Sequence, residues 1–187
     1  MSAPIKILGI SGSLRRQSFN TVLLRTMQSM IGSDIELEVA TLHGIPLYDG
    51  DLEEQEGLPQ AVRDLKARIL ANDGLLLASP EYNNSIPGVF KNAIDWLSRP
   101  PADISAVFNN RPVAVLGASP SAFGTILAQS AWLPVLRTLG TRQWAGGRLM
   151  VSKAHQLVDA NGEIHDEATL KLLRDFLQGF AQFTQGK

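Results

Sequence analysis

The sequence has no cysteine among its 187 residues. This absence excludes disulfide bonds, thiolate metal sites, iron–sulfur clusters and a cysteine nucleophile. A redox activity of this chain would therefore depend on a bound cofactor that carries the electrons.

Net charge and long apolar runs are also lacking. The formal charge is −1 at pH 7, so no strong field favours nucleic acid or an anionic membrane as a partner. No apolar run approaches the roughly 18 residues of a membrane-spanning helix. Residues 1–10 lack the basic start and long apolar stretch of a signal peptide. We therefore expect a cytoplasmic protein with no membrane or nucleic-acid partner.

The sequence predicts strands and helices that alternate over the length of a single domain. Its length suits a single α/β domain over residues 1–187 and is too short for two. Residues 5–10, 75–78 and 113–116 are continuous apolar runs, which are typical of parallel strands buried on both faces. Residues 35–41 alternate apolar and charged side chains, as a strand at a sheet edge does. A fifth strand is expected around residues 148–152.

Helical periodicity predicts five helices between and after these strands. They cover residues 20–32, 58–69, 87–97 and 122–139, and the last begins near residue 166. Asn20 is expected to cap the first helix, and Pro134 to kink or interrupt the fourth.

This alternation predicts an α/β fold, a doubly wound five-stranded parallel sheet of the flavodoxin-like order 2-1-3-4-5, with helices on both faces. In such sheets ligands bind beyond the carboxyl ends of the strands, where the strand order reverses. The chemistry is therefore expected directly after residues 10, 78 and 116.

The loop after the first strand has the residue types of a phosphate site. Ser11, Ser13 and Ser18 offer hydroxyl groups, and Arg15 offers a guanidinium fork that matches phosphate oxygens. The helix expected to begin at Asn20 adds unpaired N–H groups and the positive end of its dipole. The loop is neither a GxGxxG fingerprint nor a P-loop. The alternative is a capped loop with solvated arginines.

The loop after the third strand suits a flat heteroaromatic ring. Pro80 and Pro87 stiffen its ends, Tyr82 offers an aromatic face, and Asn83 can both donate and accept hydrogen bonds. The alternative is a polar surface turn.

The loop after the fourth strand is built mainly of small residues. Residues 117–122 read Gly-Ala-Ser-Pro-Ser-Ala, so a planar ligand could approach the backbone. A generic tight turn between strand and helix is an equally good interpretation of this segment.

Two motifs resemble those of the NAD(P)H-dependent FMN reductase family, which includes flavodoxin-like quinone, azo-dye and chromate reductases. The first loop reads Gly-x-Ser-Gly-Ser-x-Arg-x-x-Ser-x-Asn. Residues 79–96 read Ser-Pro-Glu-Tyr-Asn-x-Ser-x-Pro-Gly-x-x-Lys-Asn-x-x-Asp-Trp. The resemblance extends over essentially the whole chain. Many relatives carry a glycine-rich third loop, from which this sequence departs.

The resemblance implies which residues bind FMN. For the phosphate they are Ser11, Ser13, Arg15, Ser18 and Asn20; for the ribityl chain and ring they are Pro80, Glu81, Tyr82 and Asn83, with Ser119 near the ring. It also implies NADPH or NADH as co-substrate, a homodimer or homotetramer, and a small-molecule acceptor such as a quinone, an azo compound, chromate or free flavin.

The hypothesis is a ping-pong cycle in which hydride passes from NAD(P)H through FMN to the acceptor. The cofactor carries this chemistry, so no side chain is assigned as catalytic. One alternative is that FMN is a diffusing substrate. Another is a flavin-binding electron carrier or regulatory module without significant NAD(P)H turnover.

A metal site is not expected. His43, His155 and His165 lie far apart without metal-ligand spacing. Asp159 and Glu163 flank an Asn-Gly pair that predicts a turn rather than a calcium loop.

Overall fold

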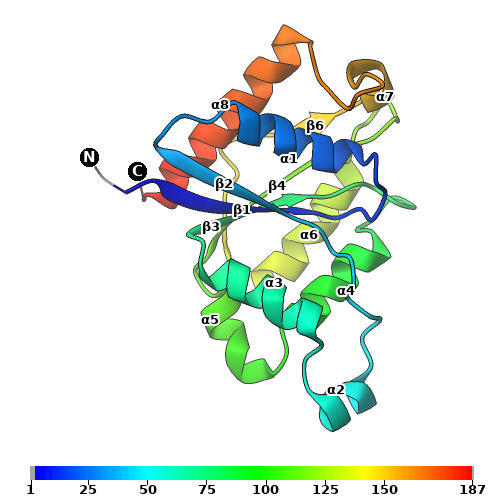
Figure 1. Ribbon diagram of the computed structural model, residues 1–187, viewed down its shortest axis with the longest axis vertical. Helices are drawn as coiled ribbons and strands as arrows, with labels where there is room; N and C mark the ends of the chain where they lie inside the picture. Colours follow the sequence, from blue (N-terminus) through cyan, green and yellow to red (C-terminus); the bar gives the residue numbers. More distant parts are fainter. Residues whose placement is uncertain (1–2, 187) are drawn as a thin grey trace.

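A computed structural model describes residues 3–186 as one parallel sheet covered by helices on both faces (Figure 1). The strands are β1 (Ile5–Ser11), β2 (Ile35–Ala40), β3 (Gly74–Ala78), β4 (Pro112–Ala118), β5 (Arg142–Gln143) and β6 (Met150–Val151). Their order is β2-β1-β3-β4-β5, with β6 also paired to β4, and every pairing is parallel. The predicted flavodoxin-like order is confirmed.

The burial of each strand follows its sequence pattern. Every residue of β3 is buried, as a continuous apolar run in the middle of a sheet requires. Strand β2 lies at the sheet edge, and its charged residue Glu36 is exposed between buried Ile35 and Leu37. Alternation therefore marked the edge strand correctly.

The helices form two layers (Figure 1). They are α1 (Phe19–Ser29), α2 (Gly50–Glu56), α3 (Gln60–Leu70), α4 (Gly88–Leu97), the 3₁₀ helix η1 (Pro101–Asp103), α5 (Ile104–Phe108), α6 (Ile126–Thr138), α7 (Ala154–Leu157) and α8 (Glu167–Thr184). Helices α1 and α8 pack on one face of the sheet, and α3, α4, α5 and α6 on the other. Helix α2, which the periodicity did not predict, has no buried residue.

Each face of the sheet has its own apolar core, and tryptophans belong to both. Trp96 and Trp132 are fully buried on the α4 and α6 side, where the Trp132 ring meets Phe90 edge-on at 4.9 Å between centroids. Trp144 is half-buried on the α8 side, and its ring lies edge-on to that of Phe176 at 4.9 Å.

The fifth position of the sheet differs from the prediction. The expected strand over residues 148–152 is present only as β6, and the chain first forms the two-residue strand β5. Between β5 and β6 the pairing with β4 is interrupted. The N–H of Trp144 donates to Val113 O at 2.8 Å, and the next main-chain bond between this segment and β4 runs from Gly117 N to Leu149 O at 3.0 Å. Strands of two residues are too short to give a periodic pattern, which is why β5 was missed.

One expectation about a helix start was wrong, and Pro134 does not interrupt its helix. The cap of α1 is Ser18, which has extended backbone angles, whereas Asn20 lies inside the helix. Helix α6 contains Pro134 without ending there. A proline removes one intrahelical hydrogen bond, and burial of Trp132 and Leu136 on either side holds the helix in place.

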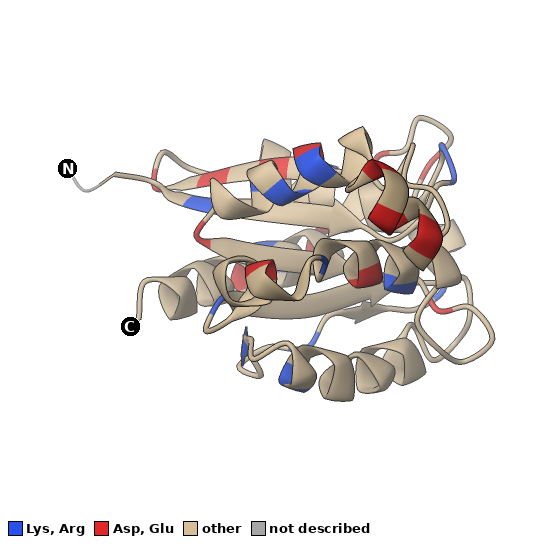
Figure 2. Cartoon of the chain, turned by 90° about the horizontal axis from the view of Figure 1, so that it is seen from below, with Lys and Arg blue, Asp and Glu red and all other residues tan. Residues whose placement is uncertain are grey.

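Lysine and arginine lie among aspartate and glutamate on the surface. Basic and acidic segments are interspersed on the face seen in Figure 2. Within residues 3–186, no helix combines the length and apolar content needed to cross a membrane.

Candidate functional site

The loops that follow β1, β3 and β4 meet at one edge of the sheet, where the sequence placed the site (Figure 1). The N–H of Gly12, just beyond β1, donates to Ala78 O at the end of β3 at 2.9 Å. The N–H of Ser79 donates in turn to Leu116 O in β4 at 2.8 Å. These bonds fix the starting points of the three loops relative to one another.

Close packing beneath the first loop requires a glycine. A Cβ atom added to Gly12 would lie 2.1 Å from Cδ1 of Phe90, a buried residue of α4. Phe90 therefore forms the floor of this loop. The sequence showed Phe90 only as part of a buried helical stripe, because nothing local connects it to the loop.

The start of α1 is open to an anion. Ser18 caps the helix by accepting from the N–H of Thr21 at 3.4 Å, and the first turn contains no acidic residue. Among residues 3–186, no acceptor takes the N–H groups of Phe19 and Asn20. The first turn thus presents unpaired donors and the positive end of the helix dipole without a carboxylate to neutralise it.

Two exposed arginines precede this helix start in the sequence. The Arg15 guanidinium lies over the Phe19 ring, 5.9 Å from its centroid. Within the described chain neither Arg15 nor Arg16 forms a salt bridge. The Arg15 guanidinium, which lies at the helix start, is therefore available to an anionic ligand.

The other predicted phosphate residues have protein partners. The Ser11 hydroxyl is buried and lies 2.7 Å from Oγ1 of Thr21. The Ser13 hydroxyl accepts from Arg15 N at 3.2 Å and lies 3.5 Å from the hydroxyl of Tyr82. Ser11 thus holds strand β1 to α1, and Ser13 connects the first loop to the second.

Asn20 uses its whole side-chain amide within the protein. Its Nδ2 donates to Ala118 O at 3.0 Å, and its Oδ1 accepts from Ala118 N at 2.9 Å. This pair ties the start of α1 to the end of β4. The main-chain N–H of Asn20 has no acceptor among residues 3–186 and remains for a ligand.

The second loop ends in a tight turn that exposes an aromatic ring. Tyr82 and Ser85 exchange two main-chain hydrogen bonds of 3.2 and 3.1 Å. Between them Asn83 and Asn84 have φ angles of 49° and 62°. Asparagine tolerates this left-handed conformation better than most residues. The turn leaves Tyr82 49% exposed and directs it toward Ser13.

The carboxylate of Glu81 points into the protein. Its Oε2 accepts from the N–H groups of Leu127 and Ala128 at 2.8 and 3.0 Å. These are donors in the first turn of α6, whose own cap residue, Thr125, makes no side-chain capping bond. Glu81 therefore caps a helix that begins 45 residues further along the chain.

The third loop holds its shape through Ser119. The buried hydroxyl donates to Gly124 O at 2.7 Å and accepts from Ser121 N at 3.2 Å. The ring of Phe123 projects from this loop and is 79% exposed. Ser119 thus organises the loop, and Phe123 is an aromatic side chain at the site that the sequence analysis did not single out.

A second glycine allows the loops after β3 and β4 to approach closely. A Cβ atom on Gly117 would lie 2.2 Å from Ser79 O and 2.3 Å from Oγ1 of Thr125. Ser79 itself is fully buried and donates its hydroxyl to Pro80 O at 3.0 Å. Pro80 is buried at the base of the second loop.

The acidic turn before α8 is built as the sequence predicted. Asp159 Oδ1 accepts from the N–H groups of Asn161 and Glu163 at 2.8 and 2.9 Å. These main-chain bonds, that from Glu163 first, together with the nearby His165 ring, hold the pKa of Asp159 below its usual value. The turn is stabilised by its own hydrogen bonds.

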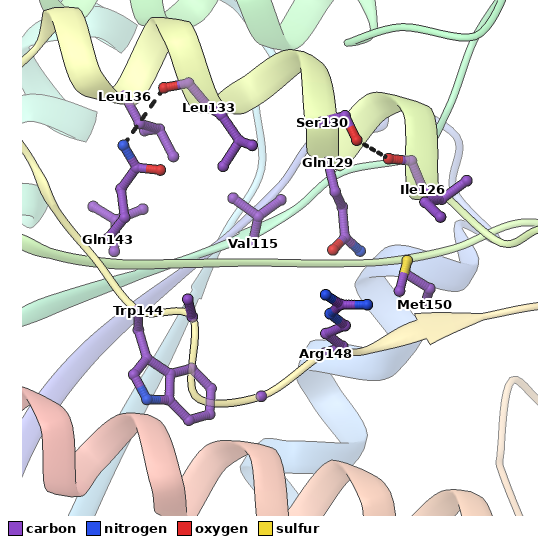
Figure 3. A pocket seen from close by; sticks show the side chains of 13 residues that line it. Val115, Ile126, Gln129, Ser130, Leu133, Leu136, Gln143, Trp144, Arg148 and Met150 are labelled. Carbon is purple, nitrogen blue, oxygen red and sulfur yellow. Dashed lines mark hydrogen bonds between the residues drawn. The ribbon is translucent and has the colours of Figure 1, made fainter.

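A cavity of about 350 Å³ lies between α6 and the segment that connects β5 to β6. Figure 3 shows Trp144 and Arg148 on one side of it and Leu133 and Gln129 of α6 on the other. None of the residues predicted to bind FMN lines this cavity. It is therefore separate from the three loops.

Comparison with known proteins identifies relatives over nearly the whole chain. Residues 5–156 match the family model described as NADPH-dependent FMN reductase. The chain is 42% identical to an NAD(P)H-dependent FMN reductase of Pseudomonas aeruginosa, over 95% of this chain and 94% of that protein. It is 37% identical to a 2-hydroxy-1,4-benzoquinone reductase of a Burkholderia species, over 98% of both.

A solved structure agrees with these relatives. The flavoenzyme NAD(P)H:(acceptor) oxidoreductase FerB of Paracoccus denitrificans superimposes with a TM-score of 0.83 at 33% sequence identity. The match covers 97% of this chain and 98% of that chain.

Proposed function

The chain belongs to the NADPH-dependent FMN reductase family, and from this premise we propose that its three strand-end loops bind FMN, with residues 1–187 forming one FMN-binding domain. The protein is an oxidoreductase that uses FMN and NAD(P)H. We propose quinones as its class of acceptor, since one relative is named a 2-hydroxy-1,4-benzoquinone reductase.

The start of α1 is the observation that carries the proposal for the phosphate. Its first turn has unpaired N–H groups, no acidic residue, and the guanidinium of Arg15 beside it. A phosphate dianion is the kind of ligand that such a helix start stabilises. We assign its binding to Arg15 and to the main-chain N–H groups of Phe19 and Asn20, while Ser11, Ser13 and Ser18 hold the loop in shape.

The second and third loops would border the ribityl chain and the ring. Tyr82 and Phe123 offer exposed aromatic surface, and Asn83 is exposed in the left-handed turn between Tyr82 and Ser85. A flat ring with carbonyl and N–H edges suits that mixture of apolar and polar groups. Pro80 and Ser119 fix the loops from below.

When bound, FMN would supply the redox chemistry, the transfer of a hydride from NAD(P)H to an acceptor that also takes up a proton from solvent. The role of the chain is to hold the cofactor and leave one side of its ring accessible. Arg15 and the start of α1 would hold the phosphate, and the loops after β3 and β4 would border the ring. No side chain is required to transfer a proton in this scheme.

We propose that the protein works as a homodimer or homotetramer. Helix α6 exposes apolar side chains at Ile126, Leu127 and Leu133, close to the proposed site. Exposed apolar side chains gathered on one helix support a subunit contact.

The visible spectrum of the purified, desalted protein tests the proposed function. A flavin band that bleaches when NADPH is added without oxygen, and returns when 1,4-benzoquinone follows, is the expected result. A colourless protein that binds no added FMN would contradict the proposal. Bleaching without steady-state quinone turnover would instead indicate an electron carrier. A desalted protein that loses its FMN but reduces added FMN with NADPH would indicate that FMN is a substrate.

A further inference from the structure

Glu81 connects two loops that otherwise belong to different parts of the chain. The residue follows β3, and its Oε2 accepts from the N–H groups of Leu127 and Ala128 in the first turn of α6, at 2.8 and 3.0 Å. Both bonds are short and charge-assisted, which makes them stronger than bonds between neutral groups.

Helix α6 depends on this remote carboxylate for its cap. Thr125 precedes the helix but makes no side-chain capping bond, and the first turn has no acidic residue of its own. Within residues 3–186, no other side chain accepts from the N–H groups of Leu127 and Ala128. Removing the carboxylate would leave two helix donors unpaired, with Ala128 N–H partly shielded from water.

We propose that Glu81 is a positioning residue: its carboxylate clamps the second loop to the start of α6 and so fixes the separation of the two loops that border the flavin ring. This inference rests on the proposed function for the location of the ring. The third loop ends where α6 begins, so holding the first turn of α6 also holds Phe123 and Gly124. Tyr82 lies next to Glu81 at the other side of the clamp.

The clamp also neutralises the positive end of the α6 dipole. A helix start next to a bound flavin would otherwise attract an anion. With Glu81 in place, this start has a negative charge beside it, whereas α1 is capped by the neutral Ser18 hydroxyl and has no acidic residue in its first turn. The carboxylate thus makes the start of α6 a poorer site for an anion than the start of α1.

The test uses Glu81→Ala and Glu81→Gln, with Asp166→Ala as the matched control. Asp166 caps α8 with a carboxylate in a similar way, accepting from Thr169 N at 2.8 Å, but belongs to none of the three loops. Hydrogen exchange of the Leu127 and Ala128 amides is measured in the FMN-free protein. The dissociation rate of FMN is measured in the loaded protein after dilution.

In Glu81→Ala we expect both amides to exchange, and FMN to dissociate, at least about tenfold faster than in the wild type, as the loss of charge-assisted bonds implies. Glu81→Gln keeps an acceptor without the charge, so both rates should rise by only about threefold. Asp166→Ala should lower the melting temperature and leave both rates at the wild-type level.

The outcomes separate this inference from the proposed function. Failure of the wild-type protein to bind FMN would overturn the proposed function. Normal FMN binding, with dissociation from Glu81→Ala no faster than from Asp166→Ala, would overturn the positioning role alone. If Glu81→Ala does not fold, Glu81→Gln decides: unchanged amide exchange and FMN dissociation in that variant would also overturn it.

Discussion

The starts of α1 and α6 lie at the same edge of the sheet and differ in charge. Helix α1 is capped by the neutral hydroxyl of Ser18 and has Arg15 beside it, whereas α6 is capped by the carboxylate of Glu81. Every helix start carries roughly half a positive charge. At α6 that charge is neutralised within the protein, and at α1 it remains for a ligand.

This difference in charge makes the two helix starts unequal as binding sites for an anion. Two equivalent helix starts near one cofactor would compete for its anionic end, and a carboxylate at one of them removes the competition. Glu81 also makes the α6 start part of the scaffold, because it joins two loops. The same physical property of a helix is therefore used at α6 for structure and, in the proposed function, at α1 for binding.

The largest expected effect comes from making α1 resemble α6. In Ser18→Asp, a carboxylate caps the helix as well as serine does, but it repels the FMN phosphate. We expect FMN affinity to fall roughly 300-fold, because one carboxylate is added close to a phosphate dianion at a site partly screened by water. Titration of the FMN-free variant with FMN, followed by flavin fluorescence, measures the loss.

Ser18→Asn is the control for this change. Asparagine caps helices as well as aspartate and adds no charge. Its FMN affinity should stay within about threefold of the wild type, since the helix cap and the dipole are both retained. Equal losses in the Asp and Asn variants would show that shape rather than charge is responsible, and would contradict the electrostatic interpretation of the α1 start.

A smaller effect is expected when the cation beside α1 is removed. Arg15→Ala should weaken FMN binding by about 1.5–3 kcal/mol, the range for a charge-assisted hydrogen bond. Arg16→Ala is the matched control, because Arg16 is its exposed neighbour and has no salt bridge within the described chain. Calorimetric titration of both variants with FMN compares them. An Arg15→Ala variant with full FMN affinity would show that the phosphate binds elsewhere.

Sequence patterns predicted the three strand-end loops but not the hydrogen bonds within and between them. Continuous apolar runs identified β1, β3 and β4, and the rule that ligands bind beyond parallel strands then located the loops. The amide of Asn20 bonds to a residue 98 positions away, and Glu81 bonds to residues 46 and 47 positions away. Such partners depend on how the sheet is assembled, and no local pattern reports them.

The elements that the sequence missed are short. Strand β5 has two residues and α2 has seven, none of them buried, so neither has enough apolar positions for a periodic signal. The segment around α2 is held instead by side chains. Glu53 accepts from Arg99 Nε at 2.8 Å and from the Tyr48 hydroxyl at 2.9 Å. The bond from Arg99 is the main reason that the pKa of Glu53 lies below its usual value.

The smallest effect concerns a third helix start, that of α8, which is capped by Asp166. The stabilisation from this charged cap should depend on pH, whereas that from the neutral Ser18 cap of α1 should not. The hydroxyl and N–H of Thr169 donate to Asp166 and hold its pKa below the ordinary value of 3.8. A carboxylate with a lowered pKa in the folded state stabilises that state above its unfolded pKa, and the stabilisation disappears as the pH falls through the folded pKa. The free energy of unfolding of the wild type should therefore exceed that of Asp166→Ala above about pH 4 and converge on it below. Urea denaturation of both proteins between pH 7 and pH 3 measures this difference, and a constant gap over the whole range would show that the Asp166 cap does not depend on its charge.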